Sequence, residues 1–176
     1  LQNAKNFIDH AKTKVSTNSS KKAMLLCGNA GIYAVSSVIN KELNDTEASQ
    51  QDTNNFLAGS QVCQKINYCE YGSDEILFGR AGFLSGIYWM NKHLSREQAI
   101  AQDIILKICD TIIESGVQYS KQKKLKTPVM MWECYGGIIN LINMNLAITF
   151  LILDKYLGAA HGMCAILHML LESPMF

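Results

Sequence analysis

The chain has 176 residues, and its 16 lysines and arginines nearly balance its 15 aspartates and glutamates, which leaves a formal net charge of +1. No global field therefore favours nucleic acid or an anionic membrane as a partner. The length suffices for one sizeable core or for a piece of a larger domain, and because the sequence begins at Leu1 rather than at a methionine we expect a fragment.

The six cysteines are scattered through apolar segments, and no CxxC pair occurs. The opening residues LQNAKNFIDHAKTK also lack the apolar core of a secretory signal. These two features favour buried free thiols in a reducing compartment over a disulfide framework.

Helices are predicted throughout, because only Pro128 and Pro174 interrupt the sequence and strand-like alternation is scarce. Two segments, near residues 2 to 15 and 46 to 68, carry sparse apolar stripes with polar backs, which is typical of outer helices. The clearest single helix is predicted to begin at Ser95, where SREQ has the spacing of a capping box and isoleucines then recur at helical spacing up to Ile112.

Three further segments are apolar nearly all round and begin alike. They read CGNAGIYAV (27–35), FGRAGFLSGIYWM (78–90) and LGAAHGMCAILHML (157–170), with paired glycines ahead of an apolar run. Such self-similarity predicts repeated helical hairpins, because one hairpin cannot bury its faces alone. We therefore expect the helices that open at Gly28, Gly79 and Gly158 to lie side by side as an inner layer.

The number of residues from Gly79 to Gly158 is much larger than that from Gly28 to Gly79. The additional residues coincide with the segment GGIINLINMNLAITFLIL (136–153). This stretch carries no charge and no helix-face pattern. Its length approaches that of a membrane span, although three asparagines would be costly in a bilayer. A membrane helix, a buried extra element and an insertion foreign to the parent fold are the three interpretations.

Five blocks of the sequence resemble the eukaryotic LanC-like proteins: GNAGIYAV, GSDEILFGRAGFLSG, ICDTIIESGVQYSKQKK, TPVMMWECYG and YLGAAHGMCAILHMLL. The resemblance implies an all-α fold, a partial α/α toroid in which inner helices are ringed by outer ones. In that family the last two blocks are almost adjacent, which favours an insertion at residues 136–154. The whole of 1–176 then reads as a truncated piece of one toroid domain.

The resemblance also implies chemistry. Related lanthionine cyclases bind zinc through two cysteines and a histidine, and the eukaryotic members are similar and are thought to add glutathione to dehydroamino acids in proteins. Zinc stabilises the thiolate nucleophile, and a nearby acid protonates the enolate that forms. The family's Cys-Gly and Trp-Cys-His-Gly zinc blocks do not occur in this sequence. We therefore expect no metal ligands here and no activity from this chain alone.

Three residues are candidates for the site by this resemblance. His161 matches the family's active-site histidine, a catalytic acid or base, and Glu75 stands where lanthionine cyclases carry a catalytic carboxylate. Arg80 could bind a glutathione carboxylate, since a guanidinium matches carboxylate geometry, or it could pair with a nearby acid. The carboxylates of Asp74 and Glu75 could instead simply favour a helix N-terminus. His161, Cys164 and His168 share a helix face, but core packing is the preferred interpretation of that spacing.

Glutathione and peptides or proteins that contain dehydroamino acids are the partners implied by the resemblance, without nucleic acid and without a transmembrane helix. The expected location is the cytoplasm, or the periphery of the plasma membrane. Two other function classes stay open. One is a non-catalytic helical scaffold that binds glutathione or protein. The other is a carbohydrate-active enzyme, because α/α toroids host these too, although a second facing carboxylate is not evident.

Deletion of residues 136–154 should leave the free energy of unfolding unchanged or raise it, because the flanking blocks are adjacent in the family that the sequence resembles. Urea unfolding of the shortened and full chains, followed by circular dichroism, measures the difference. A shortened chain that is unfolded without urea would show that the segment belongs to the core.

Overall fold

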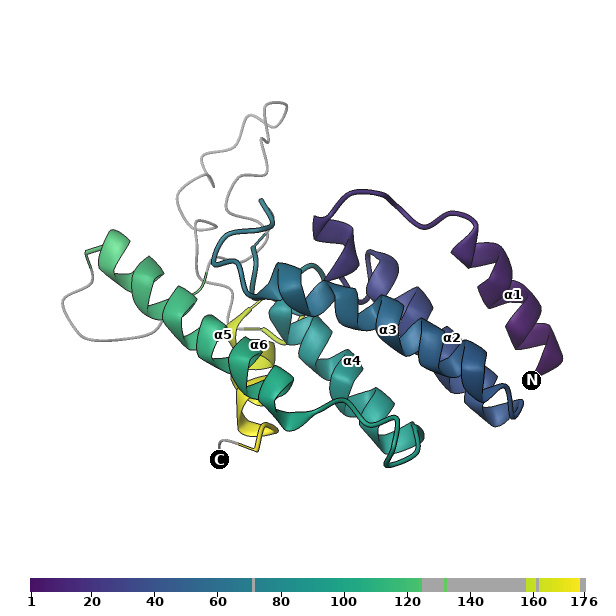
Figure 1. The fold of residues 1–176 in the computed structure, drawn as a ribbon. Helices are drawn as coiled ribbons and strands as arrows, with labels where there is room; N and C mark the ends of the chain where they lie inside the picture. The colour runs from purple at the N-terminus through teal and green to yellow at the C-terminus, as the bar shows by residue number, and fades with distance from the viewer. Residues whose placement is uncertain (71, 125–131, 133–157, 161, 175–176) are drawn as a thin grey trace, which may run out of the picture.

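The computed structural model describes residues 1–70, 72–124, 132, 158–160 and 162–174, and this part of the chain folds into helices without strands (Figure 1). The all-α prediction is confirmed. The elements are α1 (Gln2–Lys12), the short 3-10 helix η1 (Ser20–Lys22), α2 (Asn29–Glu42), α3 (Thr46–Cys63), α4 (Arg80–His93), α5 (Gln102–Gln122) and α6 (Met163–Leu171).

The helices alternate between two layers, as in a partial α/α toroid. Helix α4 packs against α2 on one side and against α6 on the other, so the three glycine-led helices form one row, as predicted. Helix α3 packs mainly on α2 and also touches α5, which places α3 and α5 in a second layer (Figure 1). Helix α1 packs on α2 at the edge of the assembly.

The apolar core lies where α4 meets its neighbours. Phe56 of α3 and Phe83 of α4 are fully buried, and their rings stack with centroids 4.4 Å apart and planes inclined by 5°. Each ring lies over a glycine of the opposite helix. A Cβ built on Gly59 would come within 2.6 Å of Phe83, and one on Gly86 within 3.2 Å of Phe56. The absence of these two side chains therefore allows the rings to stack.

The start of α5 differs from the prediction, because the helix begins at Gln102 and not at Ser95. The segment from Ser95 forms a turn, and the buried Gln98 side chain donates a hydrogen bond of 3.0 Å to Ser49 Oγ on α3. The side chain of Asn91 binds both backbone groups of Ile100, accepting from its N–H at 2.8 Å and donating to its carbonyl at 3.2 Å. These tertiary hydrogen bonds compete with helical hydrogen bonds, so the helix begins seven residues later than predicted, at Gln102.

The glycines that open the inner helices allow close backbone approach. Gly28 and Gly79 are the N-caps of α2 and α4, as predicted, but α6 is capped by Gly162 and not by Gly158. Three residues into α4, a Cβ on Gly82 would lie 2.1 Å from the carbonyl oxygen of Ile76, so only glycine fits there. Around Gly158, by contrast, nothing lies within 4 Å of such a Cβ.

The described cysteines are free, as predicted, but their burial varies. Cys63 and Cys109 are buried, whereas Cys27 and Cys164 are exposed, so the prediction that the thiols are buried is wrong for this second pair. No helix in the described ranges is long and apolar enough to cross a membrane. The predicted insertion at 136–154 lies outside the described residues and stays a prediction.

Replacing Gly82 by alanine should lower the free energy of unfolding by about 1–3 kcal/mol, because the added methyl group must displace the backbone of the preceding loop. Gly158→Ala is the matched control and should change it by less than about 0.5 kcal/mol, since the space there is open. Urea unfolding curves compare the two variants. Equal stabilities would contradict the close approach at Gly82.

Candidate functional site

The loop GSDEILFG between α3 and α4 brings two of the three predicted site residues together. It contains Glu75 and leads directly into Arg80, the first residue of α4, and both side chains are fully buried. The third residue, His161, lies outside the described residues, although Gly162, the N-cap of α6, follows it directly. The geometry of the candidate site therefore rests on this loop and on the helices around it.

The buried guanidinium of Arg80 donates hydrogen bonds to several backbone carbonyls of the connection between α3 and α4. Arg80 Nε donates to the carbonyl of Cys63 at 2.6 Å, and Nη2 donates to the carbonyl of Ile66 at 2.7 Å. Nη1 donates to the carbonyl of Ser73 at 3.2 Å, and Nη2 also donates to that of Lys65. One side chain thus closes the chain between the end of α3 and the start of α4.

The charge of Arg80 is matched by Asp74, which forms an ion pair with Nη1 and is only 2% exposed. Ser115 of α5 donates a hydrogen bond of 2.6 Å to the other carboxylate oxygen of Asp74. Burial raises the pKa of Asp74, and the positive charge of Arg80 and the Ser115 hydrogen bond oppose this rise. The pair therefore joins the loop, α4 and α5 at one buried point.

This ion pair is the second of the two interpretations that the sequence left open for Arg80. A guanidinium that donates to several carbonyls and one carboxylate has most of its five N–H groups engaged. The role of Arg80 in binding a glutathione carboxylate stays a prediction.

Glu75 is placed inside the same loop. Its Oε1 accepts a hydrogen bond from the backbone N–H of Phe78, and its carbonyl accepts one of 3.0 Å from the N–H of Gly79. The residue therefore supports the turn that ends in the N-cap of α4. A carboxylate held in this way is fixed in direction, and its catalytic role stays a prediction.

Two further groups beside Arg80 are held in their neutral forms. Burial raises the pKa of the Cys63 thiol to about 12, and it raises that of the Tyr68 hydroxyl well above its usual range. The guanidinium lies over the Tyr68 ring, 5.3 Å from its centroid. The Cys63 side chain is also fully buried, so its thiol is protonated at neutral pH and closed off from solvent.

A pocket of about 230 Å³ opens beside the ion pair. The side chains that line it are mostly polar, and they come from the connection between α3 and α4 on one side and from the last part of α5 and the residue after it on the other: Ile66, Asn67, Ser73, Asp74, Ser115, Gln118, Tyr119, Gln122 and Lys123. The arrangement suits a hydrogen-bonding molecule of small size.

The described part of the last helix contains Cys164 and His168, and the core packing predicted for this helix face is wrong at both positions, because both side chains are exposed. Cys164 is exposed, and His168 Nε2 lies 3.8 Å from a carboxylate oxygen of Glu172, with both side chains open to solvent. Among the described residues no three metal-binding side chains come together. With His161 and Cys134 outside those residues, the predicted absence of zinc ligands stays a prediction.

The sequence analysis missed Ser115 and the role of Asp74. A signal for the serine was present, because Ser115 continues the buried stripe Ile105, Ile108 and Ile112 with the same helical spacing. A serine on the core face of an amphipathic helix needs a buried partner. Its partner, however, could not be identified from spacing alone.

Comparison with known proteins shows the family to which this chain belongs. The family model for lanthionine synthetase C-like protein matches residues 1–176, and the chain belongs to that family.

Among individual relatives, the chain is similar to glutathione S-transferase LANCL1 of Danio rerio, with 27% identity over 167 residues. The match covers 94% of this chain and 36% of that relative, so the chain spans little more than a third of the relative's length. Within the family the sequence blocks look most like the LanC-like protein 3 branch, an assignment that stays a prediction.

Replacing Arg80 by methionine should lower the free energy of unfolding by about 3–5 kcal/mol, because it leaves Asp74 buried without its counter-charge. Arg96→Met is the matched control, since Arg96 is exposed, and should change it by less than about 0.5 kcal/mol. Chemical denaturation measures both. If Arg80→Met left the free energy of unfolding unchanged, the structural role of Arg80 would be contradicted and a role in binding would be favoured.

Proposed function

We propose that this chain contributes to the addition of glutathione to dehydroamino acid residues of peptides or proteins. The observation that carries the proposal is the match of the lanthionine synthetase C-like family over the whole chain, supported by a relative whose name is glutathione S-transferase. The α/α arrangement and the loop that precedes α4 provide the setting in which such a site would be built.

The reaction needs a nucleophile and an acid. The glutathione thiolate attacks the β-carbon of dehydroalanine or dehydrobutyrine, an S–C bond forms, and the electron pair of the C=C bond moves to the carbonyl as an enolate. A proton delivered to the α-carbon completes the addition. We assign this proton transfer to His161, with Glu75 as the second candidate. Arg80 would bind a glutathione carboxylate only by giving up one of the five partners to which its N–H groups now donate.

Zinc belongs to the family chemistry that the resemblance implies, where it would lower the pKa of the thiol. The described residues do not fit it, because no three metal-binding side chains come together in them.

The proposal is tested by replacing the matched segment of the Danio rerio relative with this chain. The swapped protein should add glutathione to a dehydroalanine peptide, detected as the mass of the adduct. His161→Ala in it should slow the addition by about a hundredfold or more, the usual contribution of an acid–base group. His168→Ala, at an exposed position of α6, is the matched control and should keep the rate.

Two results would contradict the proposal. The first is a swapped protein that is helical by circular dichroism and has no activity; if it still bound glutathione, the scaffold alternative would take its place. The second is equal activity of the two histidine variants. The isolated chain should neither bind zinc stoichiometrically nor accelerate the addition. If the isolated chain were active and His161→Ala abolished that activity, the chain would be an enzyme without the rest of the domain.

A further inference from the structure

Helix α1 is attached to the rest of the molecule without burying any of its residues. Phe7, its largest apolar side chain, is 79% exposed, and the helix packs mainly along α2 at the edge of the assembly (Figure 1). Little apolar area therefore leaves water when α1 docks. Ile8 and Ala11 are only half-buried, so its attachment depends largely on the polar side chains that it directs inward.

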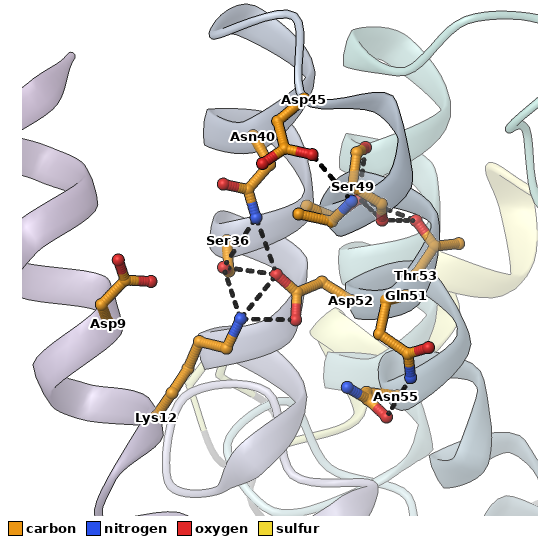
Figure 2. A network of polar contacts seen from close by, with 12 residues as sticks. Asp9, Lys12, Ser36, Asn40, Asp45, Ser49, Gln51, Asp52, Thr53 and Asn55 are labelled. Atoms are coloured by element: carbon orange, nitrogen blue, oxygen red, sulfur yellow. Dashed lines mark hydrogen bonds and ion pairs between the residues drawn. The ribbon is translucent and has the colours of Figure 1, made fainter.

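Lys12 is the main one of these side chains. Its Nζ lies 2.7 and 2.8 Å from the two carboxylate oxygens of Asp52, and it also donates to Ser36 Oγ at 3.4 Å. The Asp52 side chain is 2% exposed, whereas that of Lys12 is 30% exposed. The ion pair thus joins a partly open lysine on α1 to a buried carboxylate on α3, as Figure 2 shows.

The other partners of Asp52 are neutral. Ser36 Oγ donates to Oδ2 of Asp52 at 2.6 Å, and Asn40 Nδ2 donates to the same oxygen at 2.9 Å, both from α2 (Figure 2). In the described part of the chain Lys12 is the cation that pairs with Asp52. A second lysine of α1, Lys5, donates to Asn40 Oδ1 at 2.9 Å and pairs with Asp9 of its own helix.

Loss of the charge on Lys12 would leave Asp52 with hydrogen bonds and no counter-ion. A buried unpaired carboxylate is strongly unfavourable, and water is its best alternative partner. Release of α1 would admit that water while exposing no side chain of α1 itself that is now buried. The helices α2 and α3, which are packed on the core, would have no reason to move with it.

We propose that α1 is a latch that the positive charge of Lys12 keeps closed, and that Lys12 is a modification site at which acylation opens it. Acyl transfer from an acyl thioester to the uncharged Nζ forms an amide, releases the thiol and removes one proton, so the ammonium charge is lost. The opened state uncovers Asp52, Ser36 and Asn40, a carboxylate with two polar neighbours.

The test measures hydrogen exchange of backbone amides in the full chain, unmodified and with Nε-acetyllysine installed at position 12. The amides of α1 should exchange at least tenfold faster in the acetylated chain, while those of α2 and α3 keep their rates. Lys12→Gln should act in the same way, and Lys12→Arg should keep α1 protected. Lys14→Gln is the matched control, because Lys14 is exposed and lies two residues further along the same segment.

A compensating variant tests the mechanism. In Lys12→Gln/Asp52→Asn no charge is left behind, so α1 should recover most of its protection. Unchanged exchange of α1 on acetylation would overturn the proposal. Equal acceleration in α1, α2 and α3 would also overturn it, because the ion pair would then hold the whole bundle and not one helix.

Discussion

The buried ion pair of Arg80 and Asp74 is the interaction on which the rest of the structure depends. Arg80 is the first residue of α4, yet its side chain turns back to bind the carbonyls of the segment that leaves α3. Asp74 balances the charge of Arg80 and accepts a hydrogen bond from Ser115 of α5. Three elements therefore meet at one pair of charges, which is costly to bury and costly to break. The candidate site is built on the loop that this pair closes.

The interface of α2 with α3 is unusual in being largely polar. Buried serine, threonine, asparagine and aspartate side chains meet there, and Ser37 Oγ, for example, lies 2.7 Å from Thr53 Oγ1. Hydrogen bonds of this kind contribute little net free energy compared with apolar packing, but they have strict geometry. They fix how the two helices face each other, and they provide the carboxylate to which α1 attaches.

The sequence alone predicted the class of fold and the row of glycine-led helices, because paired glycines and all-round apolar faces are local signals. It placed the start of α5 too early, since the bonds that Asn91 makes to Ile100 and Gln98 makes to Ser49 are tertiary and leave no local trace. It identified Arg80 and Glu75 as candidates through a family resemblance. It could not show that Arg80 donates its hydrogen bonds to backbone carbonyls, because every residue type carries a carbonyl and the sequence does not mark which ones will lie nearby.

The stacked rings of Phe56 and Phe83 have a mechanical consequence. Each ring occupies the space above a glycine of the opposite helix, so α3 and α4 are locked in register in both directions. A shift of one helix along the other would drive a ring into a neighbouring side chain. Shear between the two layers is thereby opposed at this point, so a relative motion of the two helices would have to be a rotation and not a slide.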